Sequence, residues 1–324
     1  MSYFDLPVDQ LRSYTPTVAE PADFDEFWTA TIAEARAFGG TATVTPFDAG
    51  LSELEVFDVS FPGFGGEAVK GWFMLPRGRS GALPTVVEYN GYGGGRGFPH
   101  ERLAWVTAGY AYFFMDTRGQ GSVWGSGGDT PDPHGSGPSV PGFTTRGIEN
   151  PNDYYYRRVF TDAVRAIDAV RGFDRVDGDR VAVCGGSQGG GIAVAAAGLV
   201  PDLIGAMPEV PFLQNFQRAV GLNDSDPYGE IARYLAVHRG SEAQVFETLS
   251  YFDGSNFAKR ATAPAIFSVG LMDPICPPST VYSTVNHWAA SAEVVEYPYN
   301  EHEGGQGWHW RRQADWLAGI LTAR

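Results

Sequence analysis

The segment 185–190 constrains the fold of this chain more than any other part of its sequence. It reads Gly-Gly-Ser-Gln-Gly-Gly, follows the apolar run 181–184 and precedes the small-residue run 192–197. This order predicts a buried strand, a sharp turn that carries Ser187, and a helix packed closely against that strand. A serine on such a turn has a strained backbone and an exposed hydroxyl. We therefore expect Ser187 to lie at the edge of a sheet, where it can act as a nucleophile.

The rest of the chain supports an α/β fold. Apolar strands are expected at 85–89, 110–115, 181–184, 204–210, 265–269 and 294–298, and helices near 100–108, 152–171, 188–198, 278–290 and 307–321. Continuous apolar strands that alternate with helices predict a mostly parallel sheet covered on both faces, as in the α/β-hydrolase fold. An amphipathic helix at 21–37 and an antiparallel hairpin, 55–61 with 68–75, are expected before this region.

Length and pattern predict one α/β-hydrolase domain over residues 1–324. We expect a helical and hairpin extension to about residue 80, a loop insertion at about 116–150 and a helical insertion at about 211–260. The loop insertion is rich in Gly, Pro and Ser, and loops of this length are usually functional. Each insertion can cover an active site or make an oligomer contact, and plain surface decoration is the alternative.

Charge and cysteine usage exclude several classes of function. The net charge is −15 and no run of Lys and Arg occurs, which argues against nucleic-acid and anionic-membrane partners. Two cysteines, Cys184 and Cys276, form neither a disulfide framework nor a zinc pattern. We expect no metal and no cofactor, because no phosphate-binding or dinucleotide motif is present. Neither a signal-like N-terminus nor a stretch of ~20 apolar residues occurs, so the cytoplasm is the expected location.

A serine hydroxyl needs a general base, which His302 can supply. In sheets of this kind the chain order is serine, then acid, then histidine, and the histidine follows the last strand. His302 lies in the loop Tyr-Asn-Glu-His-Glu-Gly-Gly directly after the strand expected at 294–298. His287 and His309 fall within expected helices and fit this position less well.

The base needs an acid partner that holds its tautomer, and Asp273 is the candidate. It follows the strand expected at 265–269, and Pro274 ends that strand, which places the carboxylate at the carboxyl edge of the sheet. Ordinary turn chemistry before a proline is the alternative. Asp226 and Asp253 are weaker candidates because neither follows a clear strand.

Acyl transfer also requires donors aimed at the developing oxyanion. The backbone N–H of Gln188 is one expected donor, and that of Tyr92, in the loop Asn-Gly-Tyr-Gly-Gly-Gly after the first central strand, is the other. Arg118 either holds an anionic group of a ligand or forms a buried ion pair that braces this region. A short acyl pocket is expected to involve residues that follow strands or lie in the helical insertion, with core packing as the alternative: Trp105, Phe212, Pro227, Tyr228 and Ile275.

Four motifs together resemble carbohydrate esterase family 7, whose members are acetyl xylan esterases and cephalosporin-C deacetylases. They are Arg118-Gly-Gln120, Gly185-Gly-Ser-Gln-Gly189, Leu271-Met-Asp273 and His302-Glu303, and the resemblance covers nearly the whole chain. It implies the same triad and oxyanion donors as the strand order, with Arg118 and Gln120 as a structural motif. It also implies deacetylation of small substrates, such as acetylated xylooligosaccharides or cephalosporin C, and a doughnut-like hexamer.

Other functions on the same fold remain open at this point. An oligopeptidase-type serine peptidase is disfavoured because the chain lacks the length of an N-terminal propeller and an evident acidic pair for a substrate amine. An acyltransferase would share the triad and differ in water exclusion. A non-enzymatic binding protein of this fold is disfavoured, because such proteins usually lose a triad member and all three candidates are present here.

Overall fold

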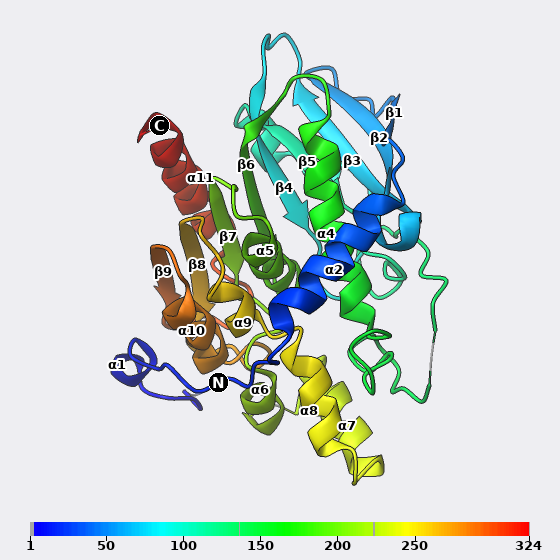
Figure 1. Ribbon diagram of the computed structural model, residues 1–324. Coiled ribbons are helices and arrows are strands. Elements are labelled where there is room, and N and C mark those ends of the chain that lie inside the picture. The colour runs from blue at the N-terminus through cyan, green and yellow to red at the C-terminus, as the bar shows by residue number, and fades with distance from the viewer. Residues whose placement is uncertain (1–2, 136, 223, 324) are drawn as a thin grey trace.

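The computed structural model describes residues 3–135, 137–222 and 224–323, and its strands form one twisted sheet (Figure 1). The strand order is β1-β2-β3-β5-β4-β6-β7-β8-β9. The strands are β1 Thr43–Pro46, β2 Leu54–Pro62, β3 Ala68–Pro76, β4 Leu83–Tyr89, β5 Ala111–Met115, β6 Val176–Gly186, β7 Gly205–Glu209, β8 Ala265–Gly270 and β9 Ala292–Tyr297. From β5 to β9 every neighbouring pair is parallel, which confirms the predicted mostly parallel sheet.

The first strands form an antiparallel extension of that sheet. The predicted hairpin is confirmed: β2 pairs with β3 in a continuous register from Leu54 opposite Pro76 to Pro62 opposite Ala68. Strand β1, on the outer side of β2, was not expected from the sequence. All four of its residues are exposed, so they carry none of the alternation between buried and exposed positions that reveals a half-buried strand.

Helices cover both faces of the sheet, as predicted. They are α1 Val8–Leu11, α2 Phe24–Ala37, α3 Ala104–Thr107, α4 Tyr155–Arg171, α5 Gln188–Leu199, α6 Phe216–Leu222, α7 Tyr228–Val237, α8 Glu242–Ser250, α9 Gly254–Ala258, α10 Pro278–His287 and α11 Gln306–Ala323, with short 3-10 turns η1 Phe64–Gly66 and η2 Pro99–Glu101. The helix expected at 100–108 is shorter than predicted and is divided into η2 and α3.

The start of α4 also differs from the expectation. The helix was expected from about residue 152, since Asn150 and Pro151 before it are residues typical of a helix start, but it begins at Tyr155. The Asn150 side chain instead accepts a hydrogen bond from the backbone N–H of Asn152 (2.9 Å). An asparagine side chain stabilises an isolated turn through the same bond that it uses at a helix start, so the sequence pattern did not distinguish the two.

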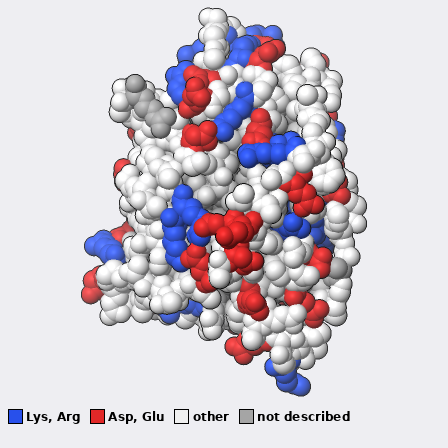
Figure 2. Space-filling model, in the orientation of Figure 1, with Lys and Arg blue, Asp and Glu red and all other residues white. Residues whose placement is uncertain are grey.

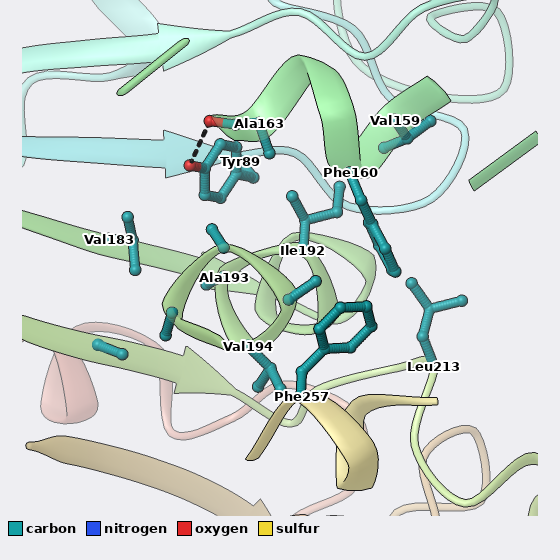
Figure 3. Packing of buried hydrophobic residues seen from close by; sticks show 14 of the residues in the cluster. Tyr89, Val159, Phe160, Ala163, Val183, Ile192, Ala193, Val194, Leu213 and Phe257 are labelled. Carbon is teal, nitrogen blue, oxygen red and sulfur yellow. Dashed lines mark hydrogen bonds between the residues drawn. The ribbon is translucent and has the colours of Figure 1, made fainter. Parts of the chain in front are cut away.

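Two apolar clusters lie on opposite faces of the sheet, because alternate residues of each strand point to opposite sides. On one face, residues such as Val87 and Val183 pack under α2, α4 and α5. Figure 3 shows this packing around α5, where the Tyr89 hydroxyl donates to the carbonyl oxygen of Ala163 (3.1 Å). On the other face, the neighbouring Val86 and the other alternate residues pack under α3 and α11.

The two insertions gather near one end of the sheet. Residues 211–260 contain α6 to α9, and α6, α7 and α8 lie beyond the carboxyl ends of the central strands (Figure 1). The described residues of 116–150 contain no helix or strand and run as a long loop beside the start of α4 (Figure 1). This end of the sheet also receives the residues that the sequence singles out for catalysis.

Charged side chains of both signs lie close together on the face shown in Figure 2. Lys259 and Arg260 both form ion pairs with Glu20. None of the helices in the described ranges has the length and hydropathy needed to cross a membrane.

Candidate active site

Ser187 lies on the predicted strained turn between β6 and α5. Its φ is 55° and its ψ is −118°, a combination that residues with side chains rarely adopt. The turn is compact: a Cβ at Gly185 would lie 2.5 Å from the carbonyl carbon of Gly189, and one at Gly189 would collide with the carbonyl oxygen of Tyr89. The Ser187 N–H donates to the carbonyl oxygen of Glu209 on β7 (2.9 Å), which fixes the turn to the sheet.

The structure brings Ser187, His302 and Asp273 into one hydrogen-bonded chain. His302 Nε2 lies 2.8 Å from Ser187 Oγ, and His302 Nδ1 lies 2.8 Å from Asp273 Oδ2. Because an ionised carboxylate only accepts hydrogen bonds, Nδ1–H donates to Asp273 and leaves Nε2 to accept from the serine hydroxyl. This arrangement can draw the proton from Ser187 as its oxygen attacks a carbonyl carbon.

Asp273 is held by its own backbone as well as by the histidine. Its side chain is fully buried, and Oδ1 accepts hydrogen bonds from the N–H groups of Ile275 (2.8 Å) and Cys276 (2.9 Å). The turn that follows β8 therefore orients the carboxylate, with one oxygen toward the turn and the other toward His302.

The weaker candidates make other contacts. His287 Nδ1 contacts a carbonyl oxygen of its own helix, and His309 is buried beside a tyrosine of β9, where burial lowers the pKa of its imidazole to about 4. Asp253 is the cap of α9, and Asp226 forms an ion pair with an arginine of α7. The hydrogen bonds of these side chains do not link any of them to Ser187.

The two predicted oxyanion donors come from the nucleophile turn itself and from the loop after β4, the strand next to β6 in the sheet. Gln188 is the first residue of α5, so its N–H belongs to the positively polarised end of a twelve-residue helix. The N–H of Tyr92 belongs to the loop after β4. Within the described ranges, neither backbone N–H donates to a protein acceptor, so both are free to bind an oxygen of a substrate.

The side chain of Gln188 joins these two segments through Gln120. The two amide side chains exchange hydrogen bonds of 2.8 and 3.1 Å, and Gln120 Oε1 also accepts from the N–H of Gly93 (2.7 Å). Gln188 Nε2 donates to the carbonyl oxygen of Asn90 (3.2 Å). Gln120 was expected only as part of a family motif, and the structure shows that it fixes the oxyanion loop to the nucleophile turn.

Two further side chains hold Tyr92, and the sequence did not reveal either. The Tyr92 hydroxyl donates to Glu230 Oε1 (2.5 Å), and Trp124 Nε1 donates to the Tyr92 carbonyl oxygen (2.6 Å). Trp124 comes from the loop insertion and Glu230 from α7 of the helical insertion. Both contacts join the oxyanion loop to residues far away in the sequence, and such contacts leave no periodic pattern, so only the two insertions pointed to this region.

Arg118 forms the buried ion pair that was one of its two expected roles. Its guanidinium makes a bidentate contact with Asp162 of α4 (2.6 and 2.9 Å) and a further hydrogen bond to Glu67 (2.6 Å). The guanidinium is fully buried, and these carboxylates occupy its donors. The Arg118 carbonyl oxygen accepts from the Tyr155 hydroxyl (2.5 Å), which extends the brace to the start of α4.

Four of the five residues expected around the acyl group lie on the active-site side of the sheet. Phe212 and Tyr228 pack edge to face at 4.5 Å, and Ile275 belongs to the same apolar cluster. Pro227 is buried directly before Tyr228. The Phe212 N–H also donates to the carbonyl oxygen of Ser187 (2.9 Å).

The structure does not bring Trp105 to this group, and its expected place was wrong. Trp105 is buried in the cluster on the opposite face of the sheet, where its ring contacts Tyr110 and Trp310 at 5.6 and 5.7 Å. The short helix α3, which carries Trp105, packs on that face. The position of Trp105 after a strand does not show which face of the sheet the helix will cover.

The described part of the chain contains no cluster of three His, Cys, Asp or Glu side chains able to hold a metal ion. A cavity of about 730 Å³ lies elsewhere, between the hairpin strands β2 and β3 and the end of α4, and Phe57, Phe73 and Phe173 are part of its lining. None of the three residues of the hydrogen-bonded chain at Ser187 lines this cavity.

Comparison with known proteins places this geometry in context. A family model described as acetyl xylan esterase (AXE1) matches residues 1–320. Acetyl xylan esterase from Paenibacillus sp. R4 has 39% identity over 97% of this chain and 99% of its own, with a TM-score of 0.91. Acetyl xylan esterase 1 from Thermoanaerobacterium sp. JW/SL YS485 has 31% identity over 98% of this chain and 99% of its own, with a TM-score of 0.90. The acetyl esterase Axe7A of Xylanibacter ruminicola is 33% identical over 161 residues, half of this chain and 36% of that protein, so the matched region spans about a third of its length.

Proposed function

Because the chain belongs to the acetyl xylan esterase family, we propose that it is a serine esterase that removes acetyl groups from small acetylated substrates. The observation that carries the proposal is the chain of 2.8 Å contacts from Ser187 through His302 to Asp273. The matching relatives are named as acetyl xylan esterases and as an acetyl esterase, which favours acetate as the acyl group.

The reaction proceeds in two steps. His302 takes the proton of Ser187 as its oxygen attacks the acetyl carbonyl carbon, and Asp273 stabilises the imidazolium that forms. The backbone N–H groups of Tyr92 and Gln188 donate to the oxyanion. His302 then gives this proton to the leaving alcohol oxygen as the ester C–O bond breaks, which leaves the acetyl group on Ser187. The same imidazole activates a water that attacks the acetyl-serine, and the serine departs with the proton while acetate is released.

The substrates are proposed to be acetylated xylooligosaccharides, other acetylated sugars or cephalosporin C. Phe212 and Tyr228 are fully buried and pack against each other, and the Phe212 N–H donates to the Ser187 carbonyl oxygen. This packed core next to the nucleophile turn leaves no depth for a long acyl chain, which supports a preference for acetyl. The enzyme should therefore hydrolyse p-nitrophenyl acetate much faster than p-nitrophenyl octanoate. Equal rates would contradict the short pocket, and acetate release from a panel of acetylated sugars and cephalosporin C would identify the preferred alcohol.

The substitution Ser187→Ala tests the nucleophile directly, with Ser52→Ala on the surface as the matched control. Turnover of p-nitrophenyl acetate should disappear in the first variant and persist in the second. Acetyl-ester turnover that survives Ser187→Ala would show that the nucleophile is assigned wrongly. Transfer of acetate to an added alcohol in preference to water would favour the acyltransferase alternative, and cleavage of peptide substrates would favour the peptidase.

A hexamer in the cytoplasm remains part of the proposal, on the basis of the family resemblance and the sequence. Size-exclusion chromatography with light scattering would test the hexamer. A monomer would contradict an assembly in which the active sites face a shared central cavity. Fractionation of producing cells would test the location.

A further inference from the structure

The residue that offers its N–H to the oxyanion is held at three points by side chains from elsewhere. The Tyr92 carbonyl oxygen accepts a hydrogen bond from Trp124, and the Tyr92 hydroxyl donates one to Glu230. The N–H of the next residue, Gly93, donates to Gln120. The loop contains no helix or strand, and its own bonds, such as that from the Gly94 N–H to the Gly91 carbonyl oxygen, form a short turn. The three side-chain contacts fix that turn to the rest of the protein and so contribute to where the Tyr92 N–H points. The hydroxyl contact is the only one of the three that links the loop to the helical insertion.

Glu230 is built into the structure as a carboxylate clamp. It lies in the first turn of α7 and is 2% exposed. While Oε1 accepts from the Tyr92 hydroxyl, Oε2 accepts from the N–H (3.0 Å) and the hydroxyl (2.6 Å) of Thr144 in the loop insertion. No Lys or Arg of the described ranges forms an ion pair with it, and burial raises the pKa of its carboxyl group, while the hydrogen bonds from Thr144 and Tyr92 act in the opposite direction.

The backbone of the loop insertion closes tightly around this carboxylate. The Phe143 N–H donates to the Tyr92 hydroxyl (2.6 Å), and a Cβ at Gly142, where φ is 127°, would collide with the Glu230 carboxylate. The rings of Tyr92 and Phe143 pack edge to face at 5.3 Å. Three segments, the oxyanion loop, the loop insertion and α7, therefore meet at one buried carboxylate.

We propose that Glu230 is a positioning residue for the oxyanion hole, which acts through the Tyr92 hydroxyl to hold the Tyr92 N–H where the tetrahedral oxyanion forms. This inference rests on the proposed function. The developing oxyanion is a better hydrogen-bond acceptor than the ester carbonyl of the bound substrate. Displacing the donor therefore costs more stabilisation in the transition state than in the bound ester. Loss of the clamp should therefore lower kcat while KM changes little.

The experiment compares Tyr92→Phe, Glu230→Ala and Glu230→Gln, all assayed with p-nitrophenyl acetate. The first two variants remove the contact, and kcat should fall about 10- to 50-fold, less than the 10²–10³ that follows removal of a donor. In Glu230→Gln the amide oxygen must face the Thr144 N–H, so the NH2 group faces the Tyr92 hydroxyl and can donate to it. The link between the two side chains is kept with its direction reversed, so part of the activity should return. Tyr92→Phe removes one oxygen atom and keeps the ring packing, so it provides a test even if Glu230→Ala does not fold.

The same helix offers a matched control. The Tyr234 hydroxyl, on α7, donates to Glu149 Oε1 in the loop insertion (2.7 Å), a bond of the same kind that does not touch the oxyanion loop. Tyr234→Phe and Glu149→Ala should leave kcat close to that of the wild type. A second readout is inhibition by trifluoroacetone, whose adduct with the serine carries an oxyanion. Its Ki should rise in Tyr92→Phe by about the factor by which kcat/KM falls.

The outcomes separate this inference from the proposed function. A wild-type protein without esterase turnover, or turnover that survives Ser187→Ala, overturns the proposed function and this inference with it. An active wild type in which Tyr92→Phe and Glu230→Ala keep full kcat overturns the inference alone. So does an equal loss in the Tyr234 and Glu149 controls, or a fall in kcat without a parallel rise in Ki, because either result would indicate a general structural role.

Discussion

Replacing Asp273 by asparagine tests the proposed proton relay, because the hydrogen bonds around this carboxylate determine which atom would face the histidine. Oδ1 accepts from the N–H groups of Ile275 and Cys276. In Asp273→Asn the amide oxygen must stay on that side, so the amide NH2 group points at His302 Nδ1. Nδ1 must then be unprotonated, the ring proton moves to Nε2, and His302 can no longer accept from Ser187.

The opposite orientation of the amide does not rescue the variant. It would place the NH2 group against two backbone N–H donors, and each buried donor left without an acceptor costs about 1–3 kcal/mol. We therefore expect kcat for p-nitrophenyl acetate near neutral pH to fall about 10⁴-fold, roughly 5 kcal/mol of barrier, the loss seen when the equivalent carboxylate of a serine protease becomes an amide. KM should change only a few-fold.

Asp253→Asn is the matched control, since Asp253 is a buried carboxylate that also accepts from backbone N–H groups, those of Asn215, Phe216 and Ser255. This variant should unfold at lower temperature and keep the kcat of the wild type once folded. If Asp273→Asn stays within about tenfold of the wild type and Asp253→Asn loses its activity, the relay is assigned to the wrong acid and the tautomer argument fails.

Three further results are expected. Arg118→Met should lower the free energy of unfolding in urea by about 3–5 kcal/mol, because it leaves the buried carboxylate of Asp162 without its ion-pair partner; a large rise in KM with unchanged stability would instead indicate a ligand contact. Gly189→Ala should destabilise the protein by about 3 kcal/mol and reduce kcat, because the added Cβ meets backbone, which cannot move aside as a side chain can; a stable, fully active variant would refute the close approach. Burial raises the pKa of Glu209 to about 7, so the folded state holds this proton longer than the unfolded chain and stability is lost as pH rises from about 4.5 to 7. Burial lowers the pKa of His309 to about 4, so its contribution has the opposite sign and stability is lost as pH falls from about 6.5 to 4. Thermal unfolding should be measured at neutral and at acid pH for the wild type and both variants. The loss of stability from neutral to acid pH should be greater in Glu209→Gln than in the wild type and smaller in His309→Gln. Identical pH profiles in all three proteins would contradict both assignments.

The sequence predicted those parts of the fold that depend on local pattern and chain order. In a parallel sheet all carboxyl ends lie at one edge, so Ser187, Asp273 and His302 were expected to meet once each was placed after its strand. Their hydrogen bonds follow from that topology. Helix α4 and the hairpin of β2 and β3 were likewise predictable, because apolar residues recur at helical spacing in the first and a glycine-rich turn joins the two strands of the second.

The parts that failed depend on directions and contacts that no local pattern encodes. Trp105 follows a strand, as an active-site residue would, but the short helix that carries it packs on the opposite face of the sheet. The strand β1 is exposed throughout and shows no alternation. Asn150 makes the side-chain bond of a helix cap within an isolated turn. In each case the local sequence is compatible with two arrangements, and tertiary packing selects one.

The surroundings of Tyr92 show why the insertions matter for the chemistry as well as for access to the site. A loop with three consecutive glycines has little intrinsic preference for one conformation, and ordering it during the reaction would raise the barrier. Here the ordering is done in advance by side chains from outside the loop: Gln120 and Trp124 from the loop insertion and Glu230 from the helical insertion. It follows that a change far from Ser187 in sequence, if it shifts α7 relative to the loop, should alter kcat before it alters substrate binding.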